Sequence, residues 1–400
     1  MGALGILAFA LAIAASIALH EAGHMFTARA FGMRVRRYFI GFGPTVWSTT
    51  KGHTEYGLAA LPFGGFCDIA GMTAMDPLTP EEEPHAMVNK PAWQRIAVLA
   101  GGIAMNLLIG VVITYFVAVF SGIPNPDADF TPRVGKTVCV ADQVDAETLG
   151  ECSGAGPAGE AGVQAGDTLV ALNGQKIEQF GQLRDAVAKQ PGETVSLEVL
   201  RGGETVTLDV PVAAVERIDP ATGEHVTQGA VGIVSATDAV KQYGPAEAVP
   251  ATFRFTGQML RATVDGIASF PAKIPGVVAS IFGAERDIEG PVSVIGASRT
   301  GGELVEQDMW SAFWMMLASL NFFLALFNLV PLPPLDGGHI AVVLYEKIRD
   351  ALRRLRGLGP GAPANYEKLM PLTYAMAALL LGVGVLVMAA DVVNPVRIFG

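Results

Sequence analysis

Long stretches without any charged residue dominate the hydrophobic pattern along this 400-residue chain. Four windows lack Asp, Glu, Lys and Arg altogether: 1–20, 96–120, 310–335 and 371–390. A helix needs about 20 apolar residues to cross the hydrocarbon core of a bilayer. The pattern therefore predicts a polytopic α-helical membrane protein with four transmembrane helices.

Shorter apolar segments follow the first window. Residues 35–49 and 54–69 are rich in glycine and aromatic residues, and they predict two strands joined by a hairpin turn at 51–53. The uncharged stretch 56–67 is too short for a helical span, which favours a hairpin partly embedded in the membrane. Residues 73–89 carry prolines and three consecutive glutamates, a composition typical of a solvated, mobile loop.

Composition supports the membrane class, since 51% of the residues are hydrophobic, 16% are charged and the mean hydropathy is +0.41. A removable signal peptide is the alternative for the first window. That window has no Lys or Arg before Arg29 and its polar residues come at its end, so the pattern favours a retained helix.

The distribution of Lys and Arg predicts which loops face the cytoplasm. Seven of these residues lie between positions 29 and 95, and six lie between the third and fourth windows. Both loops are therefore predicted to be cytoplasmic, and both termini extracytoplasmic.

The connection between the second and third windows is then exported. Residues 127–238 within it hold 18 acidic and 7 basic residues, so the acidity belongs to one exported domain and indicates no nucleic-acid partner.

The exported connection contains a further pattern. Residues 161–174 combine an apolar strand with an Asn-Gly turn, 180–189 predict a helix, and 194–200 and 205–210 predict strands. This order resembles a bacterial PDZ domain, placed at about 154–213, and the resemblance implies binding of an extended peptide at a sheet edge.

Two of the three cysteines, Cys139 and Cys152, share the exported connection. A disulfide would persist in that compartment, but the spacing alone leaves a Cys139–Cys152 bond and two free thiols equally open.

Four regions follow from these patterns. Residues 1–120 form a first membrane half, 121–244 an extracytoplasmic region with the PDZ domain, 245–309 an extracytoplasmic amphipathic connection, and 310–400 a second membrane half. Within them, 249–281 predicts an amphipathic helix interrupted by Pro271 and Pro275, and 340–355 predicts a basic amphipathic helix on the cytoplasmic face.

Three ionisable residues end the first uncharged window: His20, Glu21 and His24. Histidines four apart on a helix share one face and can hold one metal ion, with the glutamate beside them as a general base. On a soluble helix this spacing would be weak support for a metal. A charged group at the centre of a spanning helix costs about 2.5–3.5 kcal/mol, so its presence favours a functional site within the membrane.

A catalytic zinc keeps three protein ligands, so two histidines need a partner. Asp336 follows three closely spaced prolines at the end of the third window, and two glycines come after it. We predict Asp336 as the third ligand. An N-cap role for Asp336 and ligation by His339 are the alternatives.

These motifs together resemble the site-2 family of intramembrane zinc metalloproteases, in the bacterial form with a PDZ domain. The resemblance rests on an ordered series of short motifs: 20–24 (HEAGH), 40–44 (IGFGP), 54–56 (TEY), 62–66 (PFGGF), 89–91 (NKP), 94–95 (QR), 290–292 (GPV) and 328–338 (NLVPLPPLDGG). A single PDZ domain is similar to Gram-positive and actinobacterial members.

The resemblance implies one Zn²⁺ per chain held by His20, His24 and Asp336, with Glu21 as the general base. It implies that Asn328 holds substrate or stabilises the oxyanion. The hairpin would offer an edge strand to the substrate through the segments that contain Gly41, Gly43, Pro62, Gly64 and Gly65.

The implied substrates are single-pass membrane proteins such as anti-sigma factors or remnant signal peptides, cut after an upstream site-1 protease has acted outside. The implied location is the bacterial cytoplasmic membrane. A catalytically silent PDZ-containing binding protein and a metal transporter are the competing classes. Glu21 within the HExxH motif argues against the first, and the absence of an evident inverted repeat argues against the second.

Overall fold

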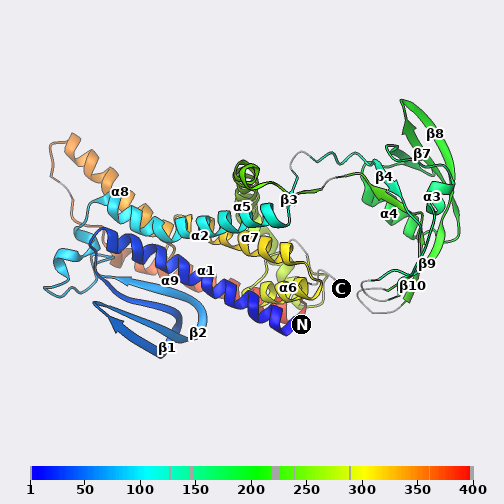
Figure 1. Ribbon diagram of the computed structural model, residues 1–400. Helices are drawn as coiled ribbons and strands as arrows, with labels where there is room; N and C mark the ends of the chain where they lie inside the picture. The colour runs from blue at the N-terminus through cyan, green and yellow to red at the C-terminus, as the bar shows by residue number, and fades with distance from the viewer. Residues whose placement is uncertain are drawn as a thin grey trace. The chain divides into compact units, whose positions relative to one another are not determined.

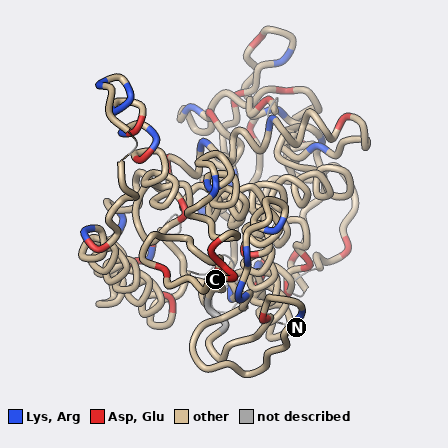
Figure 2. The backbone as a smooth tube through the Cα atoms, turned by 90° about the vertical axis from the view of Figure 1, so that its left-hand side faces the viewer, with Lys and Arg blue, Asp and Glu red and all other residues tan. Residues whose placement is uncertain are grey.

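The computed structural model covers residues 2–125, 128–144, 148–218, 225–237, 239–287, 290–359 and 361–396, and for Pro62 and Phe63 the backbone alone. The chain divides into two compact units. The helical unit comprises Met1–Gly122 and Tyr243–Ile398, and the β unit is built from Ile123–Gln242. Charged positions, blue and red in Figure 2, are sparse along the tube.

Four helices of the helical unit are long and apolar enough to cross a membrane: α1 (Gly2–Ala30), α2 (Ala92–Phe120), α7 (Trp310–Leu329) and α9 (Met370–Val393) (Figure 1). They confirm the four predicted helices. The third is shorter than its uncharged window, because the prolines that follow Leu329 cannot continue a helix.

Helices α1 and α2 touch backbone to backbone. A Cβ built on Gly23 of α1 would lie 2.3 Å from the carbonyl oxygen of Gly101 in α2, and one built on Gly101 would lie 2.6 Å from the carbonyl oxygen of Gly23. Small residues permit this approach, and van der Waals contact between helices replaces the hydrophobic effect in a bilayer.

Two further helices of the helical unit, α5 and α6, lie between the second and third spans in the described part of the chain. Helix α5 (Pro245–Ile281) runs unbroken through Pro271 and Pro275, so the predicted interruption is wrong. A proline bends a helix and removes one hydrogen bond, but the bonds on either side continue it. Helix α6 (Val294–Glu306), which the sequence patterns did not predict, packs against the first half of α1, where Gly301 lies against the ring of Phe9.

The predicted hairpin is present as β1 (Val35–Lys51) and β2 (Thr54–Ile69). Residues 37–40 of β1 have partners on both sides, 65–68 on one and 55–58 on the other, so the two long strands curl into one small sheet. The hydroxyl of Tyr38 donates a 2.6 Å hydrogen bond to the carbonyl oxygen of Ala18 and fastens this sheet to α1.

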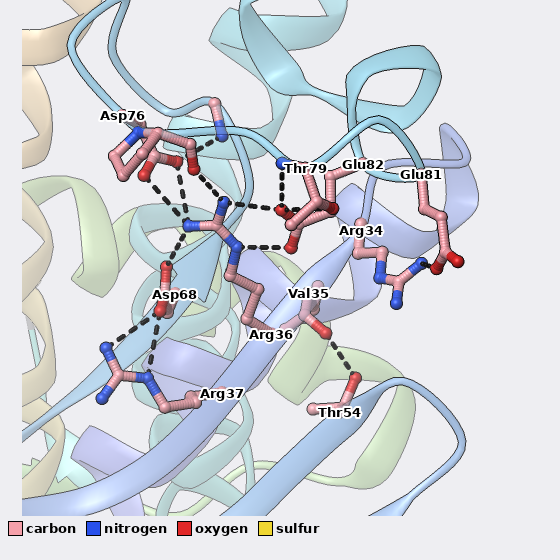
Figure 3. A network of polar contacts seen from close by, with 12 residues as sticks. Arg34, Val35, Arg36, Arg37, Thr54, Asp68, Asp76, Thr79, Glu81 and Glu82 are labelled. Carbon is pink, nitrogen blue, oxygen red and sulfur yellow. Dashed lines mark hydrogen bonds and ion pairs between the residues drawn. The ribbon is translucent and has the colours of Figure 1, made fainter.

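The segment 73–89 includes two short 3-10 helices, η1 (Glu83–His85) and η2 (Met87–Asn89). Arg36 of β1 donates to both carboxylate oxygens of Glu82, at 2.7 and 3.0 Å, and to Asp76 (Figure 3). These bonds and those from Thr79 hold the pKa of Glu82 at about 2. The prediction of a solvated segment is therefore wrong for Glu82, which is 8% exposed because it is the main partner of Arg36.

The β unit is a set of short strands around a small apolar core. Its elements are β3 (Ile123–Pro124), β4 (Val134–Thr137), α3 (Gly156–Glu160), β5 (Thr168–Leu172), β6 (Gln175–Lys176), α4 (Phe180–Ala188), β7 (Thr194–Arg201), β8 (Glu204–Pro211), β9 (Ala213–Ile218), β10 (His225–Ala230), β11 (Ile233–Ser235) and β12 (Val240–Lys241).

The largest sheet of the β unit has the strand order β6-β5-β7-β8, and α4 contributes Leu183 and Val187 to the core that it shares. The predicted helix and the two strands after it are thus confirmed as α4, β7 and β8, within one or two residues. Cys139 and Cys152 are joined by a disulfide bond.

The contact between α1 and α2 generates the first prediction. Gly23→Ala places a methyl group against a backbone oxygen that cannot rotate away, so the two helices must separate. We expect a loss of stability of about 1–3 kcal/mol, measured as a lower midpoint of thermal unfolding for the purified protein in detergent. Gly382→Ala in α9 is the control, because a Cβ there meets no atom within 4 Å. Equal midpoints for the two variants would contradict the prediction.

Candidate metal centre

Helix α1 carries His20, Glu21 and His24 in its second half, and both histidines are buried. His20 and His24 are 8% and 7% exposed, and their ring centroids are 4.9 Å apart. The four-residue spacing places both rings on the face of α1 that packs against α2. Glu21, one residue further around the helix, lies on the side of the hairpin, where a Cβ on Gly65 would come within 3.2 Å of its side chain.

The break between α7 and α8 (Asp336–Leu355) supplies a carboxylate to the same point. Helix α8 has Leu335 as its N-cap and Asp336 as its first residue, so the N-cap alternative for Asp336 is wrong. A Cβ on Gly337 would lie 2.3 Å from the carbonyl oxygen of Leu329. Glycine here lets α8 begin directly against the proline turn, and this start directs Asp336 toward α1.

Three donor atoms meet in a nearly equilateral triangle. Nε2 of His20 and Nε2 of His24 are 3.2 Å apart, and Oδ2 of Asp336 lies 3.3 Å from the first and 3.4 Å from the second. Ligands at about 2.0–2.1 Å on a tetrahedral zinc are separated by about 3.3–3.4 Å. Oδ2 of Asp336 is also buried without a hydrogen-bond donor among the described residues. The donor set therefore fits a zinc ion in type, number and spacing.

The outer nitrogen of each imidazole also has a partner, and both partners come from α2. Nδ1 of His24 lies 2.8 Å from the carbonyl oxygen of Val98, and Nδ1 of His20 lies 3.0 Å from the side-chain amide of Asn106. Nε2 can ligate a metal only when Nδ1 carries the proton, so each partner must accept a hydrogen bond. The carbonyl oxygen of Val98 accepts a hydrogen bond from His24. The amide oxygen of Asn106 accepts one from His20 once the side-chain amide is rotated by 180°.

That rotation also gives Oδ1 of Asn106 a partner, because this atom is otherwise buried and unpaired among the described residues. Gly102 completes the wall on the same helix, since a Cβ there would lie 2.4 Å from Nε2 of His24. Sequence reasoning missed both residues. A polar residue within the second uncharged window was the available signal for Asn106.

Glu21 and Asn328 both line a cavity of about 440 Å³ that opens onto the three donor atoms. Cys67 of β2 also lines this cavity. Gly64 and Gly65 line the same cavity, so the structure brings this part of the hairpin to the centre.

Other predicted residues lie away from the donor atoms. Gly41 and Gly43 are not among the residues that line the cavity, and Gly41 instead packs against the backbone of β2. The side chain of Pro62 lies outside the described residues. The described part of the chain holds one cluster with metal-ligand spacing, formed by His20, His24 and Asp336, and His339 instead stacks on Tyr366 with ring centroids 6.0 Å apart.

Comparison with known proteins is consistent with this geometry. The family model described as Peptidase family M50 matches residues 8–358, a range that contains His20, His24 and Asp336. The chain belongs to peptidase family M50. Zinc metalloprotease Rip1 of Mycolicibacterium smegmatis is 49% identical over 405 residues and covers 100% of both chains. Rip1 of Mycobacterium tuberculosis H37Rv is 45% identical over 399 residues, covering 99% of this chain and 98% of the relative.

Membership in family M50 confirms the predicted resemblance to the site-2 proteases, the zinc cofactor and the class of enzyme. This M50 peptidase is therefore an integral membrane zinc metalloendopeptidase of the site-2 protease type, with four helices of spanning length.

The hydrogen bond between His20 and Asn106 generates the second prediction. Asn106→Leu keeps the volume but removes the acceptor for Nδ1–H, so we expect zinc affinity to fall about 10–100-fold. Zinc retained against a graded series of chelator concentrations is the measurement. Asn106→Asp keeps an acceptor oxygen and should restore most of the affinity.

Thr114→Val is the control for loss of a buried polar group on α2, because Thr114 bonds only within its own helix, to the carbonyl oxygen of Gly110. Zinc retention that falls equally in Asn106→Leu and Thr114→Val would show that Asn106 has no particular role at the metal.

Proposed function

We propose that this M50 peptidase cleaves peptide bonds inside the transmembrane segments of single-pass membrane proteins. His20, His24 and Asp336 hold the zinc, and Glu21 is the general base. The observation that carries the proposal is the convergence of three donor atoms within 3.4 Å of one another, two of them on a helix of spanning length and the third at the start of α8. Catalytic zinc sites of this kind leave a ligand position free for water or substrate.

The chemistry divides between the metal and the chain. Bound zinc supplies Lewis acidity that favours hydrolysis at neutral pH. Glu21 lies in the same cavity as the ligands, takes the proton of the attacking water and passes it to the departing amine. The Asn328 amide, which lines the same cavity, donates to the substrate carbonyl as negative charge develops on it.

Substrate helices must unwind before they can be cut, because helical carbonyls are committed to hydrogen bonds. The Gly64–Gly65 segment of β2 lines the cavity and can offer backbone partners to an unwound segment. These partners matter in lipid, where an unsatisfied backbone group costs several kcal/mol. A Cβ on Gly64 would lie 2.3 Å from the ring of Phe42, and one on Gly65 would lie 2.9 Å from the carbonyl oxygen of Phe39, so this edge has no room for larger residues.

The centre lies within the membrane, toward the end of α1 that carries Arg29. Nine residues separate Arg29 from His20, and a rise of 1.5 Å per residue places the centre about 14 Å deep. We assign this end to the cytoplasm from the Lys and Arg excess in the adjoining loops. The Cys139–Cys152 disulfide in the β unit is consistent with the opposite compartment, where disulfides persist.

The β unit is proposed to contain the PDZ domain at about 154–213, and the boundaries of the four regions remain as predicted from the sequence. The four-stranded sheet with α4 packed on its core supports this assignment. We propose that the domain excludes substrates with bulky extracytoplasmic parts, so that a site-1 protease must cut first. Anti-sigma factors and remnant signal peptides are substrates of this shape.

A catalytically silent binding protein is the disfavoured alternative, because Glu21 lines the cavity where a general base is needed.

Replacement of the base gives the third prediction. Glu21→Gln keeps the size of the side chain but removes the group that accepts the proton, and we expect cleavage of a tagged transmembrane substrate in proteoliposomes to fall at least 100-fold. Zinc content is measured alongside and should stay near one per chain, whereas His24→Ala should lose zinc. Undiminished cleavage by a zinc-loaded Glu21→Gln variant would refute the proposed mechanism.

The gating role gives the fourth prediction. The wild-type enzyme is offered two forms of one substrate, intact and lacking its extracytoplasmic domain, at equal amounts in the same vesicles. We expect rapid cleavage of the shortened form alone. A variant lacking residues 154–213 should cut both forms, and equal cleavage of both by the wild type would exclude a gating function without touching the assignment of Glu21.

A further inference from the structure

A second cavity of about 590 Å³ lies at the end of α1, and its lining includes two arginines, one lysine and two histidines. We call it the basic pocket. Its charged or titratable lining residues are Arg29, Arg34, Lys51, His53 and His85, and its remaining lining residues are Gly32, Met33, Val35, Gly52, Thr54 and Tyr56. No carboxylate is present in this lining, although Glu81 approaches from outside it. A cavity with several cations and no acid in its wall favours an anionic ligand.

Arginines on the two sides of Val35 have different surroundings. Arg36 is satisfied by the carboxylates of Asp76 and Glu82 (Figure 3). Arg34 lies 4.0 Å from the carboxylate of Glu81, whose side chain is 84% exposed. An exposed pair at that distance contributes little. The guanidinium of Arg34 therefore retains donors for a ligand, whereas that of Arg36 is committed.

The other walls of the pocket come from α1 and from the hairpin turn. Arg29 donates to the hydroxyl of Thr54 at 2.9 Å and lies over the ring of Tyr56 at 5.6 Å, so it is held in place. Lys51 and His53 at the turn are exposed, and the described residues include no carboxylate paired with either. One fixed cation, Arg29, and two weakly held ones, Arg34 and Lys51, thus face a common space.

The pocket lies where a spanning helix ends. Arg29 is in the last turn of α1, after an apolar run that begins at Gly2. Phe31 packs edge-on against Trp93 at 5.1 Å, at the start of α2, and Trp93 is 61% exposed. Exposed tryptophan at the ends of two spans is typical of the interface between hydrocarbon and headgroups. A ligand at this depth is adjacent to lipid headgroups.

We propose that the basic pocket binds the phosphate of an anionic phospholipid headgroup. The Arg34 guanidinium and the Lys51 ammonium donate to the phosphate oxygens, and the acyl chains follow the apolar surface of α1 into the bilayer. The same phosphate chemistry would suit free inorganic phosphate, but the position at the end of a spanning helix favours the lipid. The bound headgroup bridges the hairpin turn and α1, the helix that also carries Glu21.

The fifth prediction uses the full-length protein, released from detergent in a native mass spectrometer, and needs no activity. Phosphatidylglycerol and phosphatidylcholine with the same acyl chains are titrated separately. We expect one phosphatidylglycerol per chain to bind tightly. Arg34→Gln combined with Lys51→Gln should weaken it about 30-fold, which corresponds to about 2 kcal/mol for two cations at a membrane surface. Zinc content should not change.

Arg354→Gln combined with Arg356→Gln is the matched control, because it removes the same charge from exposed positions at the end of α8, outside the pocket. Tight binding that survives in the control and is lost in the pocket variant supports the proposal. Equal binding by the pocket variant, equal loss in the control, or equal binding of phosphatidylcholine overturns it. Displacement of the lipid by an equal concentration of inorganic phosphate would show a free-phosphate site, and would also overturn it.

Discussion

The meeting of two imidazoles and one carboxylate at a single buried point is the constraint on which the helical unit depends. Each ionisable group placed at the centre of a span costs about 2.5–3.5 kcal/mol unless partners compensate it. Compensation requires α2 to lie close enough for Val98 and Asn106 to reach the histidines. Glycines at the crossing allow that distance, and a glycine beside the rings leaves room for them.

The third metal ligand imposes a second constraint, because it comes from the C-terminal part of the chain. The third donor must arrive from a segment more than 300 residues away in sequence, at the depth where α1 carries its histidines. Prolines that end α7, followed by glycines that let α8 start at once, place Asp336 at that depth. Irregular backbone is tolerated inside a membrane only where protein or a polar cavity surrounds it, and the cavity beside Asn328 meets that condition.

The hairpin connects the chemistry to the membrane surface. Tyr38 fastens it to α1 beside the metal centre, and Arg29 holds its turn region at the end of the same helix. Between these two attachments, β2 lines the cavity of Glu21 through Gly64, Gly65 and Cys67. The surroundings of Glu21, the proposed general base, therefore depend on the position of the hairpin, and the basic pocket lies at the outer attachment.

Much of this was accessible from the sequence. Uncharged windows predict spans because apolar length is a local property, and HExxH predicts a ligand pair because helical periodicity is local too. Only the tertiary structure showed that Asp336, and not His339, lies beside the two histidines. It also showed that Glu82 is buried against Arg36 and that Asn106 contacts His20. Those outcomes depend on which helix faces which, and periodicity along one strand or helix carries no information about the partner across the interface. The sequence by itself determined the spanning helices, the hairpin and the candidate donors, because these follow from local patterns, and packing determined which donors meet.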